Sequence, residues 1–143
     1  MMEPVVVEFT IAATPTHAFD VWTRRCSLWW PLSHSMSQEP GFQVVFEPRP
    51  GGRIYEVGGD GAQHDWGEVT RWEPPERVEY RWHIFLEPAQ ATLVTVSFEP
   101  VEDGTLVRLV NSGFEVFGDG ARRRRERVGE AWSGITQRYR AVM

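Results

Sequence analysis

The chain has 143 residues, of which 41% are hydrophobic and 24% charged, values typical of one globular domain and far from those of a disordered chain. We therefore expect a single domain over residues 1–143. The formal net charge of −5 argues against a general affinity for nucleic acid or for anionic membrane surfaces.

The first part of the chain predicts one strand followed by short helices. Residues 5–12 are rich in β-branched side chains, which is typical of a strand. Thr14 and Pro15 then provide a helix N-cap and a first-turn proline. A second short helix is predicted at residues 27–31, and residues 33–41 are polar and read as a loop.

From residue 42 onward, hydrophobic and polar residues alternate, which predicts strands. Glycine and proline clusters separate the alternating runs. The double proline of residues 73–76 indicates a turn, because consecutive prolines cannot donate hydrogen bonds to a central ladder. Short turns between successive strands favour an antiparallel meander with one buried face. The predicted strands span residues 42–47, 53–57, 66–72, 77–85, 92–99 and 106–112.

The end of the chain, residues 122–143, predicts a long amphipathic helix. Apolar side chains recur there at alternating steps of four and three residues, with polar side chains opposite. This stripe consists of Val128, Trp132, Ile135, Tyr139 and Val142. Because this helix is the only element able to cover the buried sheet face, we expect an α+β fold. Its curved antiparallel sheet of six or seven strands would wrap around the C-terminal helix, and the two short helices would roof the space between them.

Several stretches resemble a known family. From Trp66 to Trp82 the chain combines a Gly-x-Val segment, a double-proline turn and a Trp that ends the next strand. In this it resembles the START-like helix-grip superfamily, and more narrowly the branch named after the activator of the heat-shock-protein-90 ATPase. The stretch from Thr105 to Phe114 is similar to a second motif of that branch. Ala131 precedes Trp132 where many members have glycine, and the resemblance covers nearly the whole chain.

The resemblance implies a helix-grip fold with an internal cavity. The superfamily includes lipid and sterol carriers, polyketide cyclases, plant hormone receptors and co-chaperone domains. We expect a non-enzymatic domain that binds a small hydrophobic or amphipathic ligand. Two alternatives stay open: a chaperone- or stress-linked domain that binds a protein partner, and a cyclase- or hydrolase-like enzyme that uses a cavity carboxylate. At Asn111 the family frequently has histidine, so one titratable group is missing from the expected cavity.

The aromatic residues are the main candidates for lining such a cavity. The chain has seven Trp and an aromatic share of 13%, which indicates either a bulky core or a pocket lining. Core filling is the more common role of such rings. The resemblance favours a cavity of several hundred Å³. The predicted lining consists of Trp29, Trp30, Trp66, Glu68, Trp72, Tyr80, Trp82, Phe98, Asn111, Phe114 and Trp132.

Three polar residues among the strands are candidates for chemistry. By alternation Glu68 shares a strand face with Trp72, so its carboxylate either points into the cavity, as a general acid or base would, or is solvated at the sheet edge. Glu56 poses the same question with less signal. Asn111 follows two apolar residues on one face of its strand and is the best polar cavity candidate.

The remaining polar groups give no specific signal. His64 and His83 lack the companions of a zinc site, so we expect neither a metal nor a cofactor. Five arginines in residues 122–127 oppose the helix macrodipole, a misfit that could mark a partner surface. Without an aromatic platform or a recognition motif, we interpret them as a solvated face that does not bind nucleic acid.

Location and assembly follow from composition only. Cys26 is the single cysteine and cannot form an internal disulfide, which favours the reducing cytoplasm. The N-terminal residues lack the basic start and apolar run of a signal peptide, and no segment is long and apolar enough for a membrane span. We expect a cytoplasmic protein that is a monomer or a homodimer.

Overall fold

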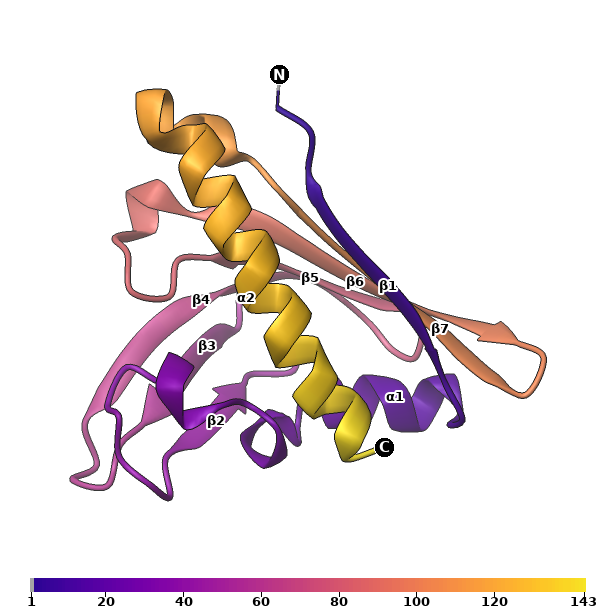
Figure 1. The fold of residues 1–143 in the computed structure, drawn as a ribbon. Coiled ribbons are helices and arrows are strands. Elements are labelled where there is room, and N and C mark those ends of the chain that lie inside the picture. Colours follow the sequence, from indigo (N-terminus) through magenta and orange to yellow (C-terminus); the bar gives the residue numbers. More distant parts are fainter. Residues whose placement is uncertain (1) are drawn as a thin grey trace.

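The computed structural model describes residues 2–143 and shows a curved antiparallel sheet with one long helix lying across it (Figure 1). The sheet has seven strands in the order β1-β7-β6-β5-β4-β3-β2. The strands are β1 (Val5–Ile11), β2 (Gln43–Phe46), β3 (Arg53–Val57), β4 (Gln63–Glu73), β5 (Arg77–Trp82), β6 (Thr92–Val101) and β7 (Gly104–Ser112). The helices are α1 (Pro15–Trp22) and α2 (Ala121–Ala141), with short helical turns η1 (Cys26–Leu28), η2 (Leu32–His34), η3 (Pro88–Gln90) and η4 (Phe114–Gly120).

The predicted meander is confirmed, since β2 to β7 are neighbours in chain order and all pair antiparallel. The first strand adds to the other edge of the sheet, where β1 pairs with β7 from Val5 opposite Asn111 to Ile11 opposite Thr105. The expected α+β helix-grip fold is therefore confirmed. Strand alternation places one row of side chains against α2 and the other row in solvent.

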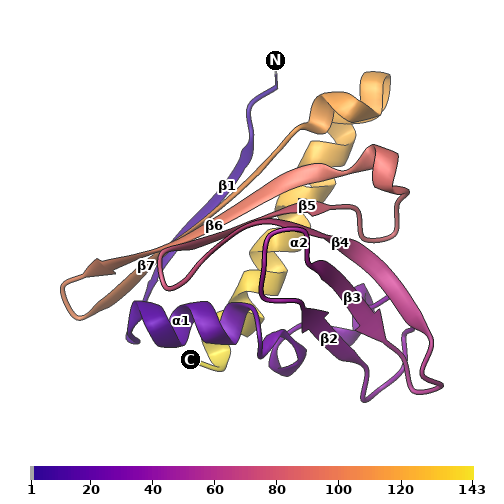
Figure 2. The ribbon, with the colours of Figure 1, turned by 180° about the vertical axis from the view of Figure 1, so that it is seen from behind.

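The segment after β1 packs beneath one end of α2. Thr14 caps α1 as predicted, because its hydroxyl oxygen accepts a 3.1 Å hydrogen bond from the backbone N–H of His17. The second predicted helix is shorter than expected, a single turn at η1. Seen from behind, α1 lies beside the C-terminal end of α2, with the sheet in front of the long helix (Figure 2).

The two halves of α2 have different surroundings. In the C-terminal half, the Tyr139 hydroxyl donates to the carbonyl of Ala18 at 2.8 Å, and Arg138 Nε donates to the carbonyl of Trp29 at 3.0 Å. These bonds join α2 to the segment of α1 and η1, whose aromatic rings fill the space below. Trp132 is buried as the apolar stripe predicts, whereas Val142 follows the helix and is 42% exposed. Under the C-terminal half of α2 the space between helix and sheet is filled by aromatic side chains.

Candidate functional site

A pocket of about 210 Å³ lies beside the N-terminal half of α2. Its walls are α2, η4, the connection between β5 and β6, the segment that carries η2, and the strand ends that carry Trp82 (β5), Thr92 (β6) and Asn111 (β7). The pocket reaches the surface, because Phe85 on its rim is 54% exposed. Its buried interior includes Trp30, Trp82, Phe114, Trp132 and Ile135.

Three indole rings form the inner wall of this pocket. The ring centroids of Trp82 and Trp132 are 5.9 Å apart, and the Trp30 ring stands nearly perpendicular to that of Trp132 at 6.0 Å. The Trp30 indole N–H donates to the carbonyl of His34 at 3.0 Å. Because the indole N–H groups of Trp30 and Trp132 are occupied by protein partners, these two rings present apolar surface to the pocket.

Asn111 lines the pocket, but its side chain is used by the protein. Its amide nitrogen donates to the Thr92 hydroxyl at 2.9 Å and to the carbonyl of Leu93 at 3.1 Å. Its amide oxygen accepts from the indole N–H of Trp132 at 3.0 Å. Both amide N–H groups are thus occupied, and the interior offers a ligand no free donor from Asn111.

Several predicted cavity residues lie outside the pocket, in the core or, for the partly buried Trp72, against the edge of the core. The Trp29 indole N–H donates to the carbonyl of Val21 at 2.8 Å, and Tyr80 accepts from the indole of Trp22 at 3.2 Å. Phe19 packs edge-on against two more of these rings. The prediction is therefore corrected for Trp29, Trp66, Trp72, Tyr80 and Phe98.

Glu68 also departs from its predicted position, because it lies on the exposed face of the sheet. Relative to the neighbouring strands, Trp66 and Thr70 are extra residues in β4, so a β-bulge precedes Glu68 and another follows it. Each bulge shifts the alternation of side chains by one residue. As a result Trp66 and Trp72 lie on the face of the sheet that packs against α2, and Glu68 lies on the opposite face. In the sheet register Glu68 lies opposite Arg53 of β3 and Arg81 of β5, and both of these residues are exposed as well.

The fully buried carboxylate of the sheet is Glu56 on β3. Its two oxygens accept hydrogen bonds from the backbone N–H groups of Met36 at 2.6 Å and Ser37 at 2.9 Å. Glu56 therefore anchors the loop that follows η2, and η2 carries His34 to the pocket. The alternation with buried Ile54 was the signal in the sequence that pointed to this burial.

The roof of the pocket differs from the prediction. Strand β5 ends at Trp82, and the connection that follows holds Ile84, Phe85 and Leu86 against the pocket. Phe85 has a positive φ of 65° inside the turn that follows the strand, in which the backbone N–H of Leu86 donates to the carbonyl of His83 at 2.7 Å. This connection and η4 cover the space assigned to the two short helices, since α1 and η1 pack under the other end of α2.

The mouth of the pocket is cationic. Arg124 and Arg127 from α2 line it, together with His34. The Arg124 guanidinium lies 4.8 Å from the centroid of the Phe117 ring. Within residues 2–143, no carboxylate forms an ion pair with Arg124 or Arg127.

In the part of the chain that the structure describes, no three His, Cys, Asp or Glu side chains are grouped as a metal ion would require. None of the helices described combines the length and the apolar character needed to cross a membrane.

The fold and its pocket define a helix-grip domain of the START-like class. The chain belongs to the family described as activator of Hsp90 ATPase homolog 1-like protein, whose model matches residues 12–139. This confirms the resemblance found in the motifs. No curated protein matches the sequence at a significant level.

Solved structures similar to this chain share its fold. Protein MLL2253 from Mesorhizobium loti is 24% identical with a TM-score of 0.72, covering 96% of this chain and 94% of that one. The Aha1 dimer from Colwellia psychrerythraea is 18% identical with a TM-score of 0.65, covering 95% and 92%. The anthrahydroquino-γ-pyrone synthase Txn09 is 34% identical with a TM-score of 0.60, covering 85% and 84%.

Proposed function

We propose that this protein binds a small, ring-containing apolar molecule in the pocket beside α2. The observation that carries the proposal is the convergence of Trp30, Trp82 and Trp132 on open space. Aromatic faces gain dispersion and apolar burial from a flat ring placed against them. The polar edges of the pocket's Trp30 and Trp132 already have partners, which favours an apolar occupant.

The size of the pocket limits the ligand. Its volume of about 210 Å³ is below the range of roughly 300–1,000 Å³ for drug-sized ligands, and thus smaller than the several hundred Å³ expected from the sequence. An apolar cavity of about 150 Å³ accommodates benzene. The pocket therefore suits one or two fused rings better than a sterol or a long acyl chain.

A second candidate function is a ring-forming reaction on the bound molecule. The 34% identity with the synthase Txn09 supports this candidate. His34 at the mouth would be the group for proton transfer, since its ring Nδ1 lies 3.1 Å from the Ser33 hydroxyl and its side chain faces the pocket. Conversion of the ligand, rather than its recovery unchanged, would distinguish the enzyme from the carrier.

The family description also keeps a protein-interaction role open. Among residues 2–143, seven large hydrophobic side chains are exposed, and Phe85 among them belongs to the pocket. A protein-binding surface would need such side chains in one contiguous patch. The convergence of indole rings supports the pocket, and a protein partner stays a prediction.

The test is a variant that fills the pocket without removing a polar group. Ala131 lines the pocket from α2, whereas Ala141 is exposed at the end of the same helix. Titrations with neutral compounds of one or two rings, followed by the indole N–H signals in NMR spectra, give the affinity. We expect saturable shifts in the wild type and in Ala141→Leu, and binding at least about tenfold weaker in Ala131→Leu. Equal binding by both variants, or no binding by the wild type, would overturn the proposal.

A further inference from the structure

The pocket separates two kinds of chemistry. Its interior is built from rings, and both N–H groups of Asn111 are occupied by protein acceptors. Its mouth carries the guanidinium groups of Arg124 and Arg127. A ligand that matches both parts has an apolar ring system at one end and an acidic group at the other.

We infer that the ligand is an aromatic anion whose ring lies against the indoles and whose acidic group binds Arg124 and Arg127. This inference rests on the proposed function and adds the chemical class of the ligand. Carboxylate is the simplest such group, because the fork of N–H donors on a guanidinium matches its two oxygens.

The geometry of α2 places both arginines on the pocket side. Arg124 and Arg127 are three residues apart, and Val128, Ala131 and Ile135 continue the same face toward the interior. Charged groups and apolar wall thus belong to one face of one rigid helix. A bound ring against Ala131 would have its acidic substituent within reach of this pair of guanidinium groups.

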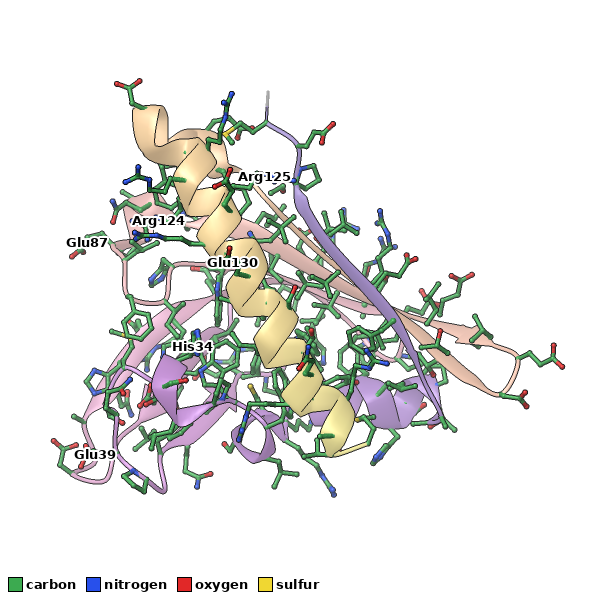
Figure 3. All side chains as sticks on the ribbon, in the orientation of Figure 1. His34, Glu39, Glu87, Arg124, Arg125 and Glu130 are labelled. Carbon is green, nitrogen blue, oxygen red and sulfur yellow. The ribbon has the colours of Figure 1, made fainter. Side chains whose placement is uncertain are left out.

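Among residues 2–143, no acidic side chain forms an ion pair with either of these two arginines. Arg124 lies over the Phe117 ring, an arrangement that leaves the N–H donors at the edge of the guanidinium available. Arg125 differs, since it donates to the carbonyls of Glu3 at 2.7 Å and Pro4 at 2.9 Å. Figure 3 shows Arg124 extending toward the connection between β5 and β6, away from the N-terminal segment that Arg125 binds.

The acidic side chains around the mouth form no ion pair with it. Glu126 and Glu130 on α2 and Glu87 on the β5–β6 connection are exposed, and none of the three is ion-paired with Arg124 or Arg127 within the described residues; Figure 3 labels Glu87 and Glu130. The chain as a whole is acidic, with a net charge of −5, yet the first turns of α2 carry five arginines. Cations at a helix N-terminus oppose the macrodipole, and an anion bound there would relieve this repulsion.

The experiment compares two ligands of the same shape but different charge, and two protein variants that each lose two positive charges. Naphthoate and naphthamide differ in the charge of a single substituent. The double variant Arg124→Gln/Arg127→Gln changes the mouth, and the matched control Arg122→Gln/Arg123→Gln removes the same charge from the same end of α2, outside the pocket lining. Dissociation constants come from the indole N–H signals in NMR titrations at fixed ionic strength.

We expect the wild type to bind naphthoate about tenfold more tightly than naphthamide, because hydrogen bonds to charged groups are the stronger ones. The Arg124/Arg127 variant should lose this preference but still bind naphthamide, which also shows that its pocket is folded. The control variant should keep the preference.

Equal affinity of the wild type for both compounds would overturn the inference and leave the proposed function standing. Equal loss of the preference in both variants would overturn it too, as an effect of overall charge. Failure of the wild type to bind either compound would reject the proposed function itself.

Discussion

The indole nitrogen of Trp132 donates a 3.0 Å hydrogen bond to the side-chain oxygen of Asn111, and this bond joins α2 to β7 in the wall of the pocket. The amide nitrogen of Asn111 in turn binds Thr92 and the carbonyl of Leu93 on β6. One buried amide thus fixes the helix to two strands. The pocket exists because the rings around it are held in place by such bonds.

Replacing Asn111 by alanine should destabilise the protein by about 2–4 kcal/mol, because the Trp132 N–H would remain buried without a partner. The free energy of unfolding from urea denaturation measures the effect. Ser112→Ala is the control on the next position of the same strand and should change stability by less than about 0.5 kcal/mol. A similar small loss for both variants would contradict the role given to Asn111.

Replacing Glu56 by glutamine should loosen the loop after η2. Glutamine has one acceptor oxygen, so one of the N–H groups of Met36 and Ser37 would lose its bond, at a cost of about 1–3 kcal/mol. Faster amide hydrogen exchange at these two residues is the expected result. Glu68→Gln changes a carboxylate on the exposed sheet face and should leave both exchange and stability unchanged. Equal exchange rates in Glu56→Gln and the wild type would rule out this anchoring role.

Stability should fall at alkaline pH. Burial raises the pKa of the Cys26 thiol above its ordinary 9.0, and burial also raises the pKa of the Tyr80 and Tyr139 phenols above their ordinary 10.0. The folded chain therefore holds these protons more tightly than the unfolded chain does. Their contribution to stability is complete below the ordinary pKa values and is lost progressively as the pH rises above them toward the raised pKa values of the folded chain.

We expect the urea midpoint to decrease as the pH rises from about 9 to about 11, and to decrease less steeply in Cys26→Ala and Tyr139→Phe. Each of these substitutions also removes packing or a hydrogen bond, so the slope with pH is the informative quantity, not the midpoint at neutral pH. A midpoint that stays constant over this range in the wild type would show that the buried groups do not couple ionisation to unfolding.

Two glycines should respond oppositely to replacement by alanine. Gly134 lies in the exposed interior of α2, and an added Cβ would meet nothing within 4 Å. Gly134→Ala should therefore stabilise the protein by about 0.5–1 kcal/mol through the lower flexibility of the unfolded chain. At Gly67 the added Cβ would lie 2.0 Å from the carbonyl oxygen of Arg81, so Gly67→Ala should cost about 1–3 kcal/mol or more. Thermal unfolding of both variants checks the signs, and stabilisation by Gly67→Ala would contradict the close approach of β4 and β5.

The fold could be predicted from the sequence because its periodic signals are strong and local. The alternation from residue 42 onward, the turn at Pro74–Pro75 and the stripe through Trp132 and Tyr139 each specify one element and its buried side. An apolar stripe of that length on one helix requires an apolar sheet face to cover it. The arrangement of helix and sheet follows from this requirement.

The pocket could be predicted only in part, because its position depends on packing between distant segments. Trp29 and Trp132 both point toward the core. Trp29 lies in filled space because α1 and η1 pack below Tyr139, whereas Trp132 lies farther along α2 and lines the pocket. The sequence does not show which part of this space α1 and η1 fill. Strict alternation places Trp66, Glu68 and Trp72 on one strand face, and the two bulges that turn Glu68 outward could not be located from it. Ile84 continues the apolar alternation of β5, so the sequence predicts a strand that runs to residue 85, whereas β5 ends at Trp82.

The most direct test of the central claim, that the pocket beside α2 holds a small ring-containing molecule, is native mass spectrometry of the wild type and of Ala131→Leu. Both proteins would be measured as purified and after incubation with an excess of small ring compounds, and again after denaturation. The structure predicts an adduct of one small molecule on the wild type that disappears on denaturation and is absent from Ala131→Leu. Identical adducts on both proteins, or a bare wild-type mass even in the presence of excess compound, would contradict it.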